Sequence, residues 1–169
     1  MNKIGAYKIE KFLGQLESTS PTPGGGSVAA LTGAMAASLV SMVAGLTIGK
    51  ERYKKAEGRM KRILGEAKTL KRNLMNLSNK DIEAFDQVML AYKSKNKVAI
   101  KKALKKAIEV PLKVILLSNK VQKLALEVAK YGNKNAFSDA KSAYYLAQAA
   151  GKSALENVRI NRKALASLK

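Results

Sequence analysis

Cysteine and histidine are both absent from the 169 residues of this chain. Without cysteine there are no disulfides and no thiolate metal sites. Without histidine, zinc hydrolase sites, serine triads and imidazole bases are excluded. Any catalysis must therefore rely on carboxylates, amines, hydroxyls, amides or backbone groups, and we expect no bound metal.

Aromatic residues and prolines are scarce: aromatics make up 5% of the chain, tryptophan is absent and there are three prolines. Hydrophobic residues nevertheless make up 47%, so the core must consist of aliphatic and small side chains, which favours helices over strands. Few turn clusters interrupt the chain, which argues against a many-stranded fold. We predict one all-α domain over residues 1–169, a bundle of long antiparallel helices.

Acidic residues are also few, 12 against 32 lysines and arginines, which gives a net charge of +20. Such an excess indicates an anionic substrate or a polyanionic partner. The basic clusters at 50–72 and 93–113 are mostly lysine and lack the aromatic platforms typical of nucleic-acid binding. Because of the high positive charge, a basic helical nucleic-acid-binding protein nevertheless remains the alternative hypothesis. The first 12 residues lack the apolar core of a signal peptide, so we predict a cytoplasmic protein.

The longest uncharged segment, Ser18–Gly49, opens with a loop of two prolines and three glycines. Residues 28–48 are predicted to form one helix with two unlike sides. Its large stripe is Val28, Leu31, Met35, Leu39, Met42 and Leu46, and its small stripe is Ala29, Gly33, Ala37, Ser41 and Gly45. The length would suit a membrane span, but the small and polar residues make insertion weak. We predict instead a central helix buried on all sides, and no membrane.

Four further helices are predicted from apolar spacing. Residues 5–17 form a short amphipathic helix, and residues 53–92 carry a long heptad-like pattern, with a break at Asn79 as an alternative. Residues 97–131 form a helix that Pro111 should kink or restart. The last helix covers 138–168, with Ser138 as its N-cap.

Asp81 stands out because it occupies the apolar seam of the long helix, one heptad after Leu74 and one before Val88. A carboxylate there faces the core or a cleft. Burial alone would raise its pKa, whereas a nearby cation would lower it. A helix cap or a buried polar group that fixes register is the alternative to a catalytic role.

The segment Gly24, Gly25, Gly26 and Ser27 opens the central helix. Free backbone amides at a helix start can bind an anion or oxyanion. The segment lacks the lysine of a phosphate-binding P-loop and follows no strand, so neither nucleotide motif applies. A tight turn that lets helices pack closely is the alternative interpretation.

Two asparagines and one aspartate complete the candidate site. Asn157 and Asn161 lie four residues apart on one helix face, where two amides can bind the edge of a planar ring, or else bond to each other or to neighbouring helices. Asp139 follows the predicted cap Ser138, where an acid often serves the helix dipole.

Several phrases, in order, resemble one family, the cyclodeaminase domain of formimidoyltransferase-cyclodeaminase together with stand-alone methenyltetrahydrofolate cyclohydrolases. Each phrase is weak alone, but the series covers nearly the whole chain. The phrases are Ser20-Pro-Thr-Pro-Gly-Gly-Gly-Ser-Val-Ala-Ala-Leu31, Asp81-Ile-Glu-Ala-Phe85, Ala107-Ile-Glu-Val-Pro-Leu112, Gly132-Asn-Lys-Asn-Ala-Phe-Ser-Asp139 and Asn157-Val-Arg-Ile-Asn161.

This resemblance implies an all-α homodimer that acts on tetrahydrofolate one-carbon units, with a folate derivative as substrate and no further cofactor. The small-residue stripe also favours dimerisation. The family's catalytic aspartate falls on Asp81. Substrate-binding positions fall on Gly24 to Ser27, Asp139, Asn157 and Asn161. Nothing in the sequence resembles a formimidoyltransferase domain, which favours ring hydrolysis over ammonia release.

Overall fold

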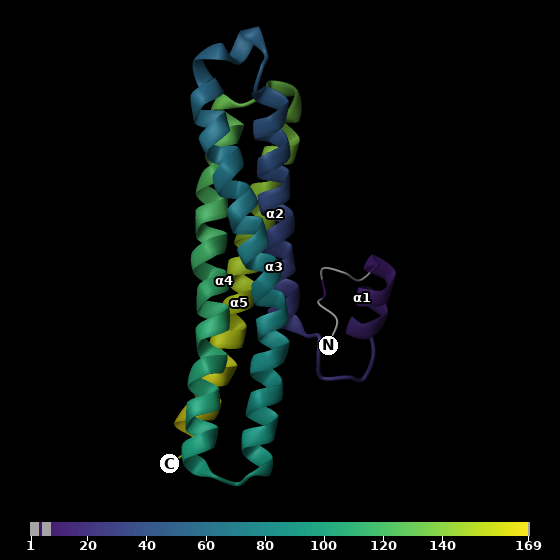
Figure 1. Cartoon of the computed structure of the whole chain (residues 1–169), viewed down its shortest axis with the longest axis vertical. Coiled ribbons are helices and arrows are strands. Elements are labelled where there is room, and N and C mark those ends of the chain that lie inside the picture. The colour runs from purple at the N-terminus through teal and green to yellow at the C-terminus, as the bar shows by residue number, and fades with distance from the viewer. Residues whose placement is uncertain (1–3, 5–7, 169) are drawn as a thin grey trace.

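The computed structural model describes residue 4 and residues 8–168 of the chain, and within them it contains helices and no strand. The helices are α1 (Ile9–Leu16), α2 (Gly25–Thr47), α3 (Glu57–Lys93), α4 (Lys97–Tyr131) and α5 (Phe137–Ala166), with short 3₁₀ segments at Glu51–Ala56 and Lys134–Ala136. The long helices α2 to α5 run up and down as a bundle, and α1 stands beside it (Figure 1). The all-α prediction is confirmed.

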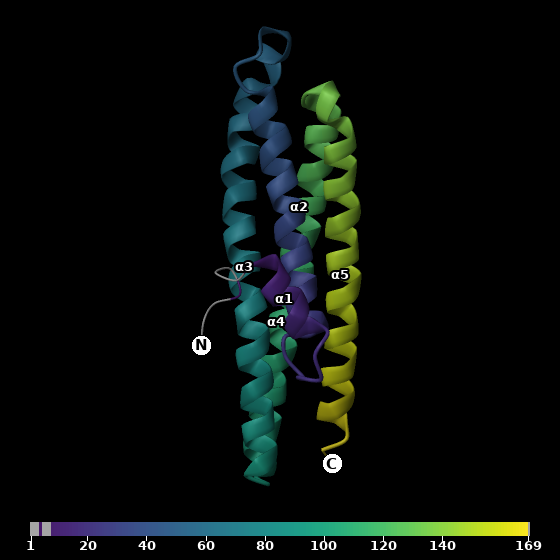
Figure 2. The ribbon, with the colours of Figure 1, turned by 90° about the vertical axis from the view of Figure 1, so that its right-hand side faces the viewer.

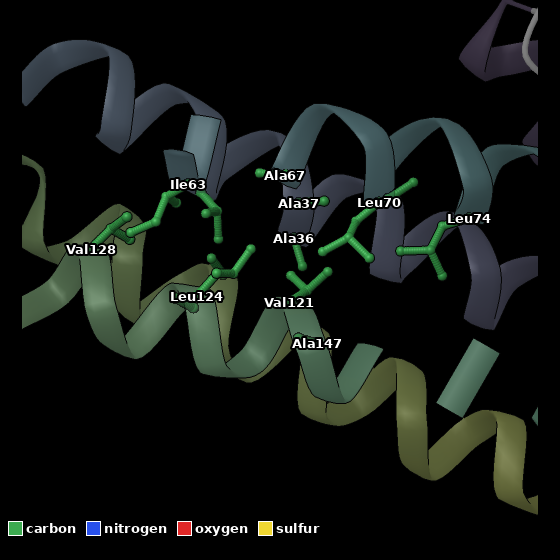
Figure 3. Packing of buried hydrophobic residues seen from close by; sticks show 14 of the residues in the cluster. Ala36, Ala37, Ile63, Ala67, Leu70, Leu74, Val121, Leu124, Val128 and Ala147 are labelled. Atoms are coloured by element: carbon green, nitrogen blue, oxygen red, sulfur yellow. The ribbon is translucent and has the colours of Figure 1, made fainter. Parts of the chain in front are cut away.

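The core runs along the bundle axis and is built from small residues on two helices and larger ones on the other two. Helices α2 and α5 contribute mainly alanines, which allow close approach, and α3 and α4 fill the space between them (Figure 3). Ile63 and Leu74 of α3 and Val121 of α4 are fully buried. The scarcity of aromatic residues is therefore matched by a core of alanines and aliphatic side chains.

Leu74 provides a direct test of this packing. Its side chain is fully buried on α3, whereas Leu90, four turns later on the same helix, is 58% exposed. Truncating a buried leucine removes contacts and leaves a cavity, so we expect Leu74→Ala to lower the free energy of unfolding by about 2–5 kcal/mol. The matched Leu90→Ala should change it by less than about 0.5 kcal/mol in urea titrations. Equal losses in the two variants would contradict this core.

Helix α2 is central, because it packs against α3, α4 and α5, but it is not buried on all sides. Ala29, Gly33 and Ala37 of its small stripe face inward and are buried, whereas Gly45 is exposed. Met35 and Met42 of the large stripe are 54% and 41% exposed. The prediction is wrong for this face, because three neighbouring helices cannot enclose a fourth completely.

The same helix is, within the described residues, the one helix long and apolar enough to cross a membrane. Half of its most apolar window is buried inside the bundle. A core helix meets the same criteria of length and hydropathy, and its small inward residues match that role.

Neither the alternative break at Asn79 nor a restart at Pro111 occurs, and the predicted N-cap at Ser138 is wrong. Helix α3 continues through Asn79, whose Oδ1 instead accepts a hydrogen bond from the Ile4 amide at 2.8 Å. Helix α4 continues through Pro111 without restarting. Helix α5 begins at Phe137 with no side-chain cap, so Ser138 lies inside its first turn. The short N-terminal helix is confirmed over Ile9–Leu16, and residues 5–7 of its predicted range lie outside the described residues.

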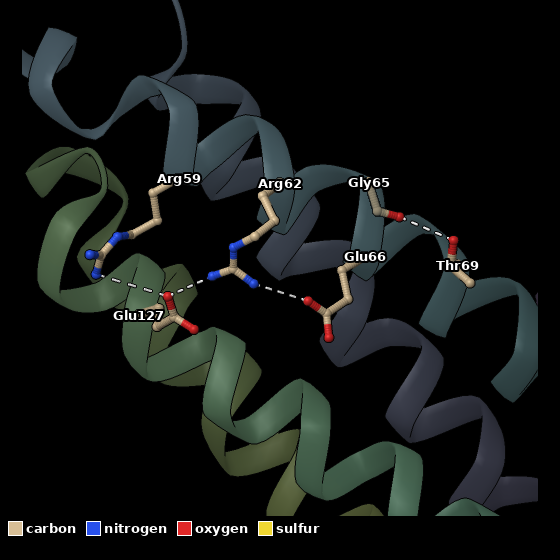
Figure 4. A network of polar contacts seen from close by, with 6 residues as sticks. All are labelled: Arg59, Arg62, Gly65, Glu66, Thr69 and Glu127. Atoms are coloured by element: carbon tan, nitrogen blue, oxygen red, sulfur yellow. Dashed lines mark hydrogen bonds and ion pairs between the residues drawn. The ribbon is translucent and has the colours of Figure 1, made fainter.

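Charged side chains link α3 to α4 on the outer face of the bundle (Figure 4). Arg62 binds Glu127 at 2.9 Å across the two helices and Glu66 at 3.2 Å along its own helix. Arg59 reaches the same Glu127 carboxylate at 4.0 Å. These groups are partly exposed, so each pair contributes little to stability, at most about 1 kcal/mol.

Candidate active site

The start of α2 lies directly against Asp81 of α3. A Cβ atom added to Gly26 would lie 2.5 Å from the Asp81 carboxyl carbon and 2.6 Å from its Oδ2. Any side chain at position 26 would therefore displace the carboxylate. Glycine is required here because it lets backbone and carboxylate approach closely.

Ser27 holds the carboxylate from behind. Its side chain is fully buried, and its Oγ lies 3.1 Å from Asp81 Oδ2 and 3.0 Å from the Ser78 carbonyl oxygen, to either of which it can donate. The Ser27 backbone amide also donates to the carboxylate. Two donors of the same residue fix the orientation of the Asp81 carboxylate at the start of α2.

Burial raises the pKa of Asp81 above the ordinary aspartate value, and the hydrogen bonds from Ser27 partly oppose that rise. The carboxyl group thus lies where desolvation favours its neutral form and two donors favour its ionised form. A carboxyl group in such a setting is suited to accept and return a proton during a reaction.

Ser27→Ala should shift the titration of Asp81 further upward. The substitution removes a hydrogen bond that stabilises the ionised form, so the acid limb of the activity profile should move to higher pH. Ser78→Ala is the matched control, because that buried hydroxyl donates to the Met75 carbonyl and not to the Asp81 carboxylate. Equal shifts in both variants, or no shift, would show that Ser27 does not tune the carboxylate.

A cavity of about 410 Å³ opens in front of this carboxylate, between the start of α2, the second half of α3 and the last turns of α5. Of the predicted site residues, six line it: Gly24, Gly25, Gly26, Asp81, Asn157 and Asn161. Asp81 is the one carboxylate among the lining residues, and the described part of the chain holds no cluster of three or more acidic residues suited to a metal ion.

Two predicted residues do not line the cavity. Ser27 lies behind Asp81, as described above. Asp139 lies in the first turn of α5, eighteen residues and therefore roughly 27 Å before Asn157 along the helix. The separation follows from the length of α5, and within one chain Asp139 cannot reach a ligand held between Asp81 and Asn157.

Asn161 is held by a backbone carbonyl of α4 that a proline leaves without its helical partner. Pro111 has no amide hydrogen, so the carbonyl of Ala107, one turn earlier in α4, lacks its usual helical partner. The Asn161 Nδ2 donates to that carbonyl at 3.1 Å. The side-chain oxygen of Asn161 then remains available to a ligand in the cavity.

Asn157 lies one turn before Asn161 and beside the glycine segment. Its Nδ2 donates to the Ser153 carbonyl at 3.1 Å and would lie 3.7 Å from a Cβ added to Gly25. The two amides therefore form one polar edge of the cavity, opposite the apolar side chains of α3.

That apolar wall was not among the predicted site residues. Phe85, Met89 and Tyr92 line the cavity from α3, at positions four, eight and eleven residues after Asp81. This spacing keeps them on the same helix side as the carboxylate. Phe85 and Tyr92 are visible in the sequence as large residues that widen the apolar stripe of this helix, but Leu64 does the same before Asp81, so the pattern alone does not mark the cavity wall.

Comparison with known proteins agrees with this arrangement, since residues 8–168 match the family described as formiminotransferase-cyclodeaminase. The chain belongs to that family. It is 44% identical over 170 residues to the methenyltetrahydrofolate cyclohydrolase of Methylorubrum extorquens, with 95% of this chain and 82% of that protein covered.

Two further relatives place the family in context. The crystal structure of formiminotetrahydrofolate cyclodeaminase from Thermotoga maritima matches with a TM-score of 0.92 and 36% identity, over 96% of this chain and 81% of that one. The formimidoyltransferase-cyclodeaminase of Dictyostelium discoideum is 32% identical over 80% of this chain, which corresponds to 26% of that longer protein. The family member described here therefore corresponds to a part of the longer protein.

Proposed function

We propose that this protein is a tetrahydrofolate one-carbon enzyme that hydrolyses 5,10-methenyltetrahydrofolate to 10-formyltetrahydrofolate. The observation that carries the proposal is the single desolvated carboxylate, Asp81, held at the wall of the cavity. The 44% identical relative named as a methenyltetrahydrofolate cyclohydrolase supports this reaction.

The chemistry of the ring suits one carboxylate. The methenyl bridge is a cationic amidinium, which the ionised form of Asp81 stabilises electrostatically. Water adds to the bridge carbon and passes a proton to Asp81. As the bond between the bridge carbon and N5 breaks, Asp81 returns that proton to N5. The proton of the remaining hydroxyl leaves to solvent as the formyl C=O forms, so one proton is released per turnover.

The cavity has two unlike sides that fit a folate. Phe85, Met89 and Tyr92 offer apolar surface to a flat ring system. Asn157 and Asn161 offer amide groups to the hydrogen-bonding edge of a pterin. A volume of about 410 Å³ lies within the range of small-molecule sites, roughly 300–1,000 Å³.

A second reaction is favoured by the solved relative, which is named as a formiminotetrahydrofolate cyclodeaminase. In that reaction 5-formiminotetrahydrofolate closes to the same methenyl compound and releases ammonia. The same carboxylate would protonate the departing nitrogen. Both reactions share the methenyl compound, as product in one and substrate in the other, so one absorbance band reports on both.

We also propose a homodimer, supported by the exposed apolar face of α2, where Met35, Met42 and Leu46 are each more than 40% exposed. The family assignment favours a folate substrate over the nucleic-acid alternative. The positive charge then serves to attract a substrate that carries glutamate carboxylates.

The deciding experiment mixes purified protein with 5,10-methenyltetrahydrofolate and follows the loss of its near-ultraviolet absorbance against the uncatalysed rate. Accelerated loss supports the cyclohydrolase reaction. Growth of the same band from 5-formiminotetrahydrofolate, without accelerated loss, supports the cyclodeaminase reaction instead. A folded protein that accelerates neither reaction would overturn the proposal.

A further inference from the structure

Helix α1 is an amphipathic helix whose apolar side is left largely exposed by the described residues. None of its eight residues is buried, and Ile9 and Leu13, one turn apart on one side, are 78% and 53% exposed. The helix stands off the bundle on the side of α2 (Figure 1). A helix this short is marginal in water by itself, so its apolar side calls for a surface to pack against.

Helix α2 presents such a surface. Met35, Met42 and Leu46 recur along its outward side and are 54%, 41% and 44% exposed. No charged residue occurs from Ser18 to Gly49. The C-terminal half of α2 is also clear of α1, which lies beside the N-terminal half (Figure 2).

The distribution of charge favours a second copy of the chain as the occupant of this surface. Residues 8–49 contain two lysines and two glutamates and are therefore neutral, whereas the whole chain carries +20. Two copies repel each other through every strongly basic face but not through this one. An acidic partner would gain nothing from a neutral surface and would bind the basic faces instead.

Symmetry brings the two features together. A twofold contact pairs the same patch on both copies, and an axis across α2 near Met35 sets the two α2 helices antiparallel. The C-terminal half of α2 in one copy, with Met42 and Leu46, then comes to the level of α1 in the other.

We propose that α1 is an exchanged arm, which packs Ile9 and Leu13 against Met42 and Leu46 of a second copy and thereby fixes the loop that walls the cavity. The loop at residues 17–24 joins α1 to α2, and its Pro21, Thr22 and Gly24 line the cavity. With α1 docked on the second copy and α2 fixed in the bundle, both ends of this loop are held in place. The inference rests on the proposed homodimer and is independent of which reaction the cavity catalyses.

The cysteine-free sequence makes a covalent test specific. A Leu13→Cys chain and a Met42→Cys chain, distinguished by different tags, are co-expressed and treated with a short bis-maleimide. We expect a covalent species that contains both tags, because each chain has one thiol and the two thiols meet only between copies. Denaturing electrophoresis and mass spectrometry detect it.

The matched control replaces Leu13→Cys by Gly14→Cys, the neighbouring position, which faces open space. At least a fivefold higher yield from the Leu13→Cys pair supports the arm. Equal yields, or no mixed species, would overturn it. An intramolecular cross-link in a Leu13→Cys/Met42→Cys chain on its own would also overturn it, because α1 would then cover its own α2.

A second measurement separates the arm from the chemistry. Leu13→Glu should weaken dimerisation in sedimentation velocity by at least tenfold in Kd and raise KM, while kcat at saturating substrate changes less than threefold. Gly14→Glu, which adds the same side chain to the open side, should leave both unchanged. If wild type is inactive on both folates, the cross-link and sedimentation results still decide the arm.

Discussion

Asp81→Asn should lower kcat by about 10²–10⁴, the usual contribution of a positioned acid–base group. The amide has the same shape and keeps the cavity intact, but it can neither take a proton from water nor stabilise the cationic ring. Binding contacts to Asn157 and Asn161 remain, so KM should change much less than kcat. The measurement is the steady-state rate of loss of methenyl absorbance.

The same variant should not be less stable than wild type at neutral pH. Burial raises the pKa of Asp81 in the folded chain. The ionised carboxylate therefore weakens the fold at pH 7, and wild type gains stability as pH falls through the folded pKa. Asp81→Asn lacks that dependence. Urea titrations of both proteins at pH 4 and pH 7 test the sign of this stability difference. Separately, wild-type turnover in Asp81→Asn would show that Asp81 takes no part in the mechanism.

Gly26→Ala should lose about 10² in kcat, although it adds a single methyl group. The new Cβ would occupy the space of the Asp81 carboxylate, which lies within 2.6 Å of that point at both its carbon and Oδ2. The carboxylate must rotate away, and a displacement of about 1 Å in a catalytic group costs a factor of this size. The fold should survive, because a side-chain end moves and not backbone.

Gly25→Ala is the matched control. A Cβ at position 25 meets Asn157 Nδ2 at 3.7 Å, an ordinary contact, so kcat should stay within about threefold of wild type. In the Gly26→Ala/Asp81→Asn variant the two losses should not add, because both remove the same group. Full additivity, or equal losses in Gly25→Ala and Gly26→Ala, would show that Gly26 does not act through Asp81.

The sequence predicted the long helix of residues 53–92 and the seam position of Asp81 because both depend on spacing along one helix. It predicted less about α2. A stripe of large apolar residues predicts burial but does not say which surface provides it. The structure shows Ala29, Gly33 and Ala37 of the small stripe packed inside, Gly45 exposed, and Met35 and Met42 facing outward.

The parts of the site that the sequence did not reveal depend on contacts between distant segments. The hydrogen bond from Asn161 to Ala107 exists because Pro111 lacks an amide hydrogen, and no local pattern relates position 161 to position 111. Asp139 is predicted as a site residue because it belongs to one of the sequence segments that resemble the family. Sequence order alone does not give the distance along α5 that separates it from the cavity.

The contact between Gly26 and Asp81 has a consequence for how this family can diverge. The Asp81 carboxylate occupies the space that a side chain at position 26 would need. Position 26 can therefore accept a side chain only in a lineage where the residue at position 81 has already become smaller or has lost its role. A homologue that keeps the fold but carries alanine or serine at the place of Gly26 should thus have abandoned the reaction. The codon for position 26 would therefore distinguish active from inactive family members in a genome survey, before any protein is made.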